Sequence, residues 1–79
     1  MIREKFYEIM EKEDGFDELI GEVEDMLKEE KEKGNIKHYE YFSDEDVFDS
    51  CGLSIFYLSI CWIDLEDKLH IAGDRYYSH

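Results

Sequence analysis

The sequence has 79 residues, no proline, five glycines and two cysteines, and these shortages narrow the possible classes of protein. With so few chain-breaking residues, linkers and disordered tails are not expected, and residues 1–79 should form a single domain. Cys51 and Cys61 are too few for a disulfide framework. We expect both to be free thiols in a reducing compartment.

Long hydrophobic runs are also missing. The most apolar run covers residues 53–63, about half of the roughly 20 residues that a bilayer-spanning helix needs. Residues 1–5 are charged and begin an amphipathic segment, with no apolar signal region. We therefore expect a cytoplasmic protein that makes no contact with a membrane.

Basic residues are scarce, with nine Lys and Arg against 22 Asp and Glu and a net charge of −13. The excess is spread evenly: residues 1–35 hold 13 acids and 6 bases, and residues 36–79 hold 9 and 3. Such a field repels nucleic acid and anionic lipid but attracts basic protein surfaces. A basic protein is therefore the expected partner, with no direct contact to nucleic acid.

Residues 2–33 are predicted to be helical, because apolar side chains recur at spacings of three, four or seven. These side chains are Ile2, Phe6, Ile9, Phe16, Ile20, Val23 and Leu27. Asp14-Gly15 interrupts the segment and would allow two helices, the second capped by Asp17. However, apolar positions 2, 9, 16 and 23 keep one seven-residue register through this point. The pattern favours a single long helix, with a kink allowed at Gly15.

Residues 36–42 and 53–64 are rich in β-forming side chains and are predicted to be strands. Residues 65–68 carry a reversal, after which residues 69–72 return as a third strand. Ser43 and the acids that follow it are typical of a helix N-terminus, which predicts a short helical turn at about 44–51. The expected fold class is α+β, with the long helix packed on a three-stranded antiparallel sheet whose centre is residues 53–64.

The predicted central strand is apolar on both faces. One face carries Leu53, Ile55, Tyr57, Cys61 and Ile63, and the other carries Phe56, Leu58, Ile60 and Trp62. The expected core is Phe6, Ile9, Ile20, Val23, Leu27, Ile55, Leu58 and Trp62, or opposite-face neighbours of the strand residues. Because one helix covers one face, residues 44–51, a second copy or a partner must cover the other. We therefore expect a homodimer.

No combination of residues in the sequence indicates a particular enzymatic reaction. The zinc-competent side chains Cys51, Cys61, His70 and His79 lack the close-pair spacing of structural zinc sites. The acid clusters at 44–49 and 64–67 lack the ligand pattern of a calcium loop. No nucleophile elbow or glycine-rich loop accompanies His38 or His70. We expect no enzymatic activity, metal or cofactor. A deep pocket that holds a histidine in contact with a carboxylate is the observation that would favour catalysis.

The predicted helix carries a row of acids opposite its apolar stripe. If the helix is continuous, eight carboxylates lie along roughly 42 Å, about 6 Å apart on average, a spacing in the range of phosphates along one nucleic-acid strand. The candidate partner-binding residues are Glu4, Glu8, Glu11, Glu18, Glu22, Asp25, Glu29 and Glu32, with Asp44, Glu45, Asp46 and Asp49 as a second patch. An amphipathic helix also has a charged face when it only contacts solvent.

These observations lead to two hypotheses. The first is a non-enzymatic acidic inhibitor that mimics nucleic acid to block a basic nucleic-acid-binding protein or nuclease. In size and charge the chain resembles small phage-encoded or immunity-type inhibitors, a likeness that rests on no shared motif. The alternative is a small homo-oligomeric adaptor that binds through an apolar sheet face and through Tyr39, Tyr41, Tyr76 and Tyr77. Salt should weaken binding by mimicry steeply and apolar association little.

Overall fold

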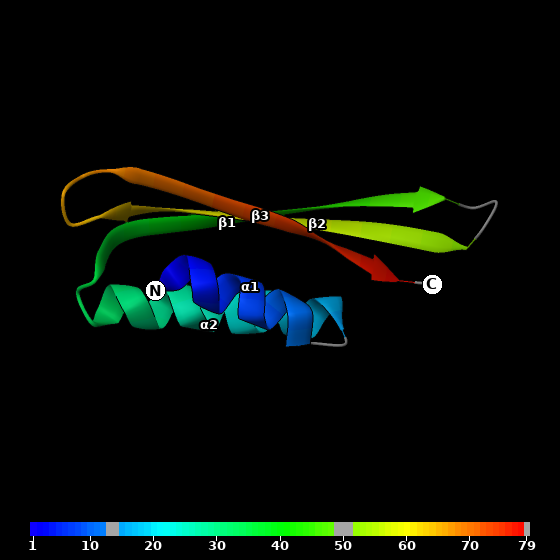
Figure 1. Ribbon diagram of the computed structural model, residues 1–79, viewed down its shortest axis with the longest axis horizontal. Coiled ribbons are helices and arrows are strands. Elements are labelled where there is room, and N and C mark those ends of the chain that lie inside the picture. The colour runs from blue at the N-terminus through cyan, green and yellow to red at the C-terminus, as the bar shows by residue number, and fades with distance from the viewer. Residues whose placement is uncertain (13–14, 49–51, 79) are drawn as a thin grey trace.

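The computed structural model describes residues 1–12, 15–48 and 52–78. Two helices precede three strands: α1 (Ile2–Lys12), α2 (Phe16–Glu32), β1 (Ile36–Phe48), β2 (Leu53–Asp64) and β3 (Leu69–Ser78). The strands form one antiparallel sheet in the order β1-β2-β3. Both helices lie on the same side of this sheet (Figure 1). The predicted α+β class and the central position of β2 are confirmed.

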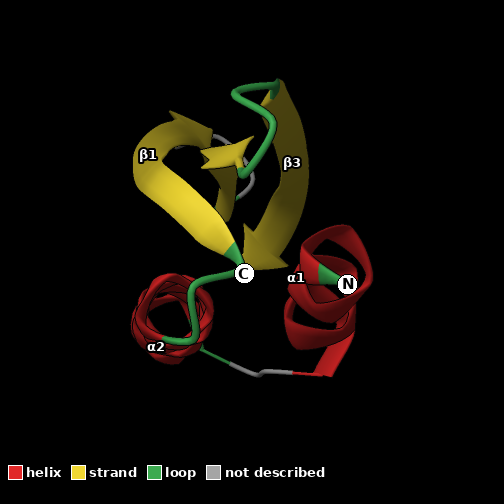
Figure 2. Ribbon diagram, turned by 90° about the vertical axis from the view of Figure 1, so that its left-hand side faces the viewer, coloured by secondary structure: helices red, strands yellow, loops and turns green. Residues whose placement is uncertain are grey.

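The N-terminal segment forms two helices, so the expectation of one continuous helix is wrong. α1 ends at Lys12, and α2 begins at Phe16 after Gly15, whose backbone is extended (φ −127°, ψ 141°). The helices lie side by side, α1 against β3 and α2 against β1 (Figure 2). Two short helices cover the width of three strands better than one long helix could. Since both pack on the same sheet, each needs an apolar stripe, and the seven-residue register persists without continuity.

β1 continues to Phe48, so the helical turn expected at about 44–51 is wrong over residues 44–48. Residues 49–51 lie outside the part of the chain that the structure describes. Ser43 pairs with Leu58 and Asp44 with Tyr57 in the β1–β2 ladder. The backbone groups of β2 need hydrogen-bond partners along the whole strand. This requirement overrides the helix-capping preference of Ser43 and the acids after it.

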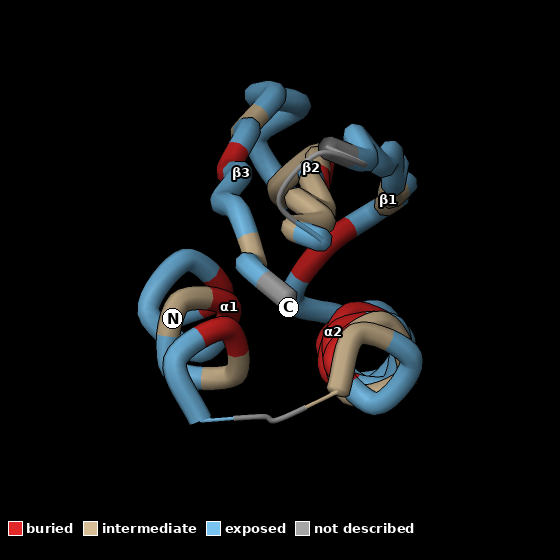
Figure 3. Tube along the Cα trace, turned by 90° about the vertical axis from the view of Figure 1, so that its right-hand side faces the viewer, coloured by how far each residue is buried: buried red, intermediate tan, exposed pale blue. Residues whose placement is uncertain are grey.

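The core lies between the helices and one face of the sheet (Figure 3). Its largest fully buried side chains are Phe6, Leu19, Leu27, Leu58, Ile60 and Val23. Of the predicted core, Phe6, Val23, Leu27, Leu58 and Trp62 are buried, and Ile9 and Ile20 pack against them. Ile55 is only half-buried. Phe16 at the start of α2 stacks on Phe56, with ring centroids 4.4 Å apart.

The sheet is longer than the helical layer. The molecule measures 47 × 19 × 15 Å, and the joined end of β1 and β2 extends beyond both helices (Figure 1). Val47 near this end is 56% exposed, although its partner Ser54 belongs to the row of β2 that faces the helices. The reversal predicted at residues 65–68 is confirmed, and β3 continues beyond residue 72 to Ser78.

Candidate functional site

The face of the sheet that points away from the helices is apolar and uncovered by any described element. Directly paired residues of an antiparallel sheet share a face, so the register assigns this outer face. Its apolar residues are Phe42, Leu53, Ile55, Tyr57, Cys61, Ile63, Leu69, Ile71 and Tyr77. Leu69 and Ile71 are each 62% exposed, and Phe42 is 59% exposed. Large exposed apolar surfaces mark interaction sites in soluble proteins.

One margin of the outer face is acidic. Glu40, Asp44 and Asp46 occupy outer-face positions of β1, where they pair with Cys61, Tyr57 and Ile55, and all three are exposed. Alternate residues of a strand are about 7 Å apart. Phe42 occupies the position between Glu40 and Asp44, so Asp44 and Asp46 are neighbours on this face and Glu40 lies one further position away. We refer to these three carboxylates beside the apolar surface as the acidic margin.

A polar chain crosses the outer face from β1 to β3. The Tyr57 hydroxyl hydrogen-bonds to Asp46, and this bond is the main cause that raises the pKa of Tyr57. The guanidinium of Arg75 lies 5.8 Å from the centre of the Tyr57 ring. Arg75 also hydrogen-bonds to Tyr77, which raises the pKa of the guanidinium. These contacts link the acidic margin to aromatic side chains of β2 and β3.

A shallow hollow of about 530 Å³ lies on this face beside Tyr57, Ser59, Arg75 and Tyr77. The hollow forms here because Gly73, which has no side chain, pairs with Ser59, which has a small one. A Cβ atom at Gly73 would lie 3.0 Å from Ser59 Oγ, tighter than ordinary van der Waals contact. The hollow would accept a projecting side chain of a partner, as central interface positions often do.

The acids predicted to bind a partner through one helix are divided between two helices. Glu4, Glu8 and Glu11 belong to α1, and Glu18, Glu22, Asp25, Glu29 and Glu32 belong to α2. The single row of eight carboxylates therefore does not form. Seven of the eight are exposed, and Glu22 is half-buried. Glu22 Oε2 is buried and has no hydrogen-bond partner in the described part of the chain, which makes it a poor contact for a partner.

The second predicted patch is only partly described. Asp44, Glu45 and Asp46 are exposed on β1, and Asp49 lies outside the described residues. Glu45 pairs with Phe56 and therefore points to the helix side, away from the acidic margin. The strand thus separates acids that a helical turn would have grouped.

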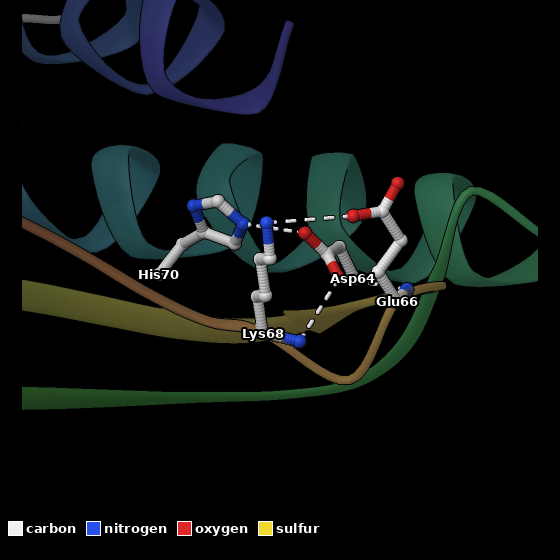
Figure 4. A network of polar contacts seen from close by, with 4 residues as sticks. All are labelled: Asp64, Glu66, Lys68 and His70. Carbon is white, nitrogen blue, oxygen red and sulfur yellow. Dashed lines mark hydrogen bonds and ion pairs between the residues drawn. The ribbon is translucent and has the colours of Figure 1, made fainter.

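A second candidate site is a pocket of about 610 Å³ at the start of α1. His70 Nε2 lies 2.8 Å from Asp64 Oδ2 inside it, and Figure 4 shows both side chains projecting from the sheet toward the helices. Asp64 Oδ1 also accepts hydrogen bonds from the backbone N–H groups of Glu66 and Lys68. The His70 contact first, and then the backbone bonds, lower the pKa of Asp64 to about 2.

Aromatic and charged groups complete the pocket. The His70 ring stacks on Trp62 with centroids 5.1 Å apart, and the Arg3 guanidinium lies 5.6 Å from the Trp62 ring. The Glu30 carboxylate accepts hydrogen bonds from Lys5 (2.7 Å) and Asn35 (2.6 Å), which lower its pKa. Glu30 is 6% exposed, so these two bonds satisfy an otherwise costly buried charge.

Sequence reasoning treated His70 and Asp64 separately and missed their contact. The sequence did contain a signal for this contact, because the predicted reversal at residues 65–68 brings the end of β2 beside the start of β3. A pocket that holds a histidine against a carboxylate was the observation expected to favour catalysis. Among the described residues that line this pocket, none is a serine, threonine, cysteine or tyrosine. The Asp64–His70 pair thus lacks an adjacent side-chain nucleophile to activate.

Other features bear on metals, membranes and thiols. No group of three or more His, Cys, Asp and Glu side chains suited to a metal ion occurs in the described ranges. Neither α1 nor α2 is long and apolar enough to cross a membrane. Cys61 is a free, half-buried thiol on the outer face, and Cys51 lies outside the described residues. No protein-family model, curated protein or solved structure matches the chain.

Proposed function

We propose that this chain is a non-enzymatic acidic protein that binds a basic protein partner through the outer face of its sheet. The observation that carries this proposal is the exposed apolar surface of β2 and β3 beside the acidic margin of β1. Apolar side chains would supply the buried centre of the contact, and Glu40, Asp44 and Asp46 would face cations at its rim. The partner would present an apolar patch bordered by Lys and Arg.

Charge favours such a partner over a second copy of the chain. Each copy carries a net charge of −13, so two copies that approach each other repel. Arg75 is the one Lys or Arg at an outer-face position of the described strands. A basic partner removes this repulsion and gains electrostatic steering during association. A homodimer is the competing outcome of the tests below.

The basic partner would be a nucleic-acid-binding protein or nuclease, blocked because acids occupy the surface that nucleic acid uses. A second candidate surface for this mimicry is the helical layer. Six of its predicted acids are exposed and make no ion pair within the described residues: Glu4, Glu8, Glu11, Glu18, Asp25 and Glu32. Glu29 is paired with Lys33 at 2.9 Å. The helical layer would bind through charge alone.

The test begins with capture of proteins from host lysate on the immobilised chain, followed by purification of any basic protein retained. Its affinity is then measured for three variants: Ile71→Ser, Asp44→Asn/Asp46→Asn, and Glu18→Gln/Glu22→Gln/Asp25→Asn. The outer-face proposal expects the first two to weaken binding at least tenfold and the helix variant to leave it unchanged. Raising salt from about 50 to 500 mM should weaken the wild type only partly, since apolar contacts are not screened.

Cys61 supplies an independent footprint, because it pairs with Ile71 on the outer face. In a Cys51→Ser background, bound partner should slow alkylation of the Cys61 thiol. Unchanged alkylation, together with loss of binding in the helix variant and competition by nucleic acid, would establish the helical layer as the site instead. Slow alkylation of the isolated chain, with a mass of twice 9.5 kDa by light scattering, would establish the homodimer.

A further inference from the structure

The pocket at the start of α1 concentrates positive charge in an acidic chain. Three of the nine Lys and Arg residues line it, namely Arg3, Lys5 and Lys33, together with His70. Only two carboxylates line it, those of Glu30 and Asp64. In a chain with 22 Asp and Glu residues, this is a local reversal of the overall charge balance.

Both carboxylates of the pocket already have partners. Glu30 Oε1 accepts from Lys5 and Oε2 from Asn35. Asp64 Oδ1 accepts two backbone N–H groups, and Oδ2 meets His70. Their capacity to accept further hydrogen bonds is therefore largely used within the protein.

Donors, by contrast, remain available. Arg3 has five N–H donors, and one of its nitrogens donates a hydrogen bond to the Ile71 carbonyl. Lys5 has three donors and gives one to Glu30. The first turn of α1 starts at Ile2 on the pocket wall, where backbone N–H groups lack helical partners and the helix dipole favours negative charge.

The remaining walls are apolar. Ile2, Ile36 and Trp62 line the same pocket, and all three belong to the buried core. A volume of about 610 Å³ lies within the range of roughly 300–1,000 Å³ that small-molecule sites occupy. The site therefore combines an apolar wall with cationic donors that are not fully used within the protein.

We propose that this pocket binds a small organic anion, with an oxyanion head on Arg3 and an apolar body against Trp62 and Ile36. The head is a carboxylate or a phosphate, since both accept hydrogen bonds from guanidinium. Asp64 holds His70 against Trp62 and so shapes the wall beside the head. The pocket lies on the helix side of the sheet, so this site is separate from the outer face and independent of the proposed function.

The chain contains one tryptophan, so Trp62 fluorescence reports on the pocket directly. The probes are hexanoate, hexyl phosphate, hexanol and inorganic phosphate. Hexanoate or hexyl phosphate should give a saturable change at millimolar concentration, and the stronger of the two identifies the head group. Hexanol lacks the charge and inorganic phosphate lacks the apolar body, so each should bind at least tenfold more weakly.

Arg3→Gln should weaken the stronger probe about tenfold, the usual effect of losing one charge-assisted hydrogen bond. Arg75→Gln is the matched control, because it removes the same charge from the opposite face of the sheet and should change nothing. Equal losses in the two variants would show a non-specific charge effect and overturn the proposal. Hexanol binding as tightly as hexanoate would overturn it too.

A second measurement protects the test against misfolding of Arg3→Gln. Backbone NMR shifts of the wild type, titrated with the stronger probe, should move at Arg3, Lys5 and His70 and stay unchanged at Tyr57 and Arg75. Shifts confined to other residues, or no saturation by either anion up to about 50 mM, would reject the pocket as a binding site.

Discussion

The two faces of the sheet differ in what covers them far more than in composition. Toward the helices β2 presents Leu58 and Ile60, both with no exposed surface, and away from them it presents Cys61 and Ile63, both half-buried. The neighbouring strand makes the contrast stronger, because Ala72 is 3% and Ile71 62% exposed. A strand that is apolar on both sides thus packs one face in the core, while no described element covers the other face.

The largest expected effect separates stability from binding by substituting the same residue type on each face. Ile60→Ala should lower the free energy of unfolding by about 2–5 kcal/mol, because it empties space in a closed core. Ile71→Ala on the adjacent strand should change it by less than about 1 kcal/mol. Urea denaturation followed by circular dichroism measures both. Similar losses from the two variants would mean that the outer face is buried, as in a homodimer.

A smaller effect is expected where a charge is buried on the helix side. Lys5→Met leaves the Glu30 carboxylate, which is 6% exposed, with Asn35 as its remaining hydrogen-bond donor among the described residues. The substitution should lower the free energy of unfolding by about 1–3 kcal/mol. Lys33→Met is the matched control, because its partner Glu29 has a side chain that is 65% exposed and exposed pairs contribute little. Denaturation midpoints at pH 7 measure both variants. Equal midpoints would show that Glu30 recruits water or another partner.

The Asp64 carboxylate predicts a dependence of stability on pH. Its pKa is lowered from 3.8 to about 2 in the folded chain, so the unfolded chain binds the proton more readily. Its contribution to stability is therefore present above about pH 4 and is lost as the pH falls toward 2. Asp64→Asn should destabilise the protein at pH 5, and the difference from wild type should shrink toward pH 2. Asp74→Asn, at an exposed position of β3, serves as the matched control.

How far the sequence predicted this structure depended on whether local pattern or tertiary contact decided each element. β2 and the reversal after it were predictable, because a long apolar run ends at residues 64–68, four of which are charged. The extension of β1 through Asp44 and Asp46 was not, because pairing with β2 outweighs their preference for a helix N-terminus. The division of residues 2–33 into two helices was a weighed alternative, and the packing of two helices on one sheet decided it.

The candidate sites show the same division. The division of the β2 residues between two apolar faces was predictable from alternation alone. Which face the helices cover was not, and Ile55, expected in the core, lies on the outer face. The pocket was not predicted, because it joins Arg3 and Lys5 of α1 to Trp62 of β2 and His70 of β3, and no spacing in the chain expresses that contact. The prediction of one acidic row was wrong, because it required a single continuous helix and the structure has two.

The smallest expected effect tests whether binding and stability are independent. Gly21 lies inside α2, and a Cβ atom added there meets nothing within 4 Å. Gly21→Ala should therefore raise the free energy of unfolding by about 0.5–1 kcal/mol, because alanine loses less conformational freedom in a helix. Gly34 has φ +79°, and Gly34→Ala should destabilise the chain, since alanine disfavours that conformation. Thermal unfolding measures both.

Neither glycine is among the residues assigned to the outer face. Partner affinity should therefore fall in Ile71→Ser and stay unchanged in the two glycine variants, although their stabilities differ. An affinity that rises with Gly21→Ala and falls with Gly34→Ala would instead show that the partner binds a surface whose formation is coupled to α2, and would favour the helical layer as the site.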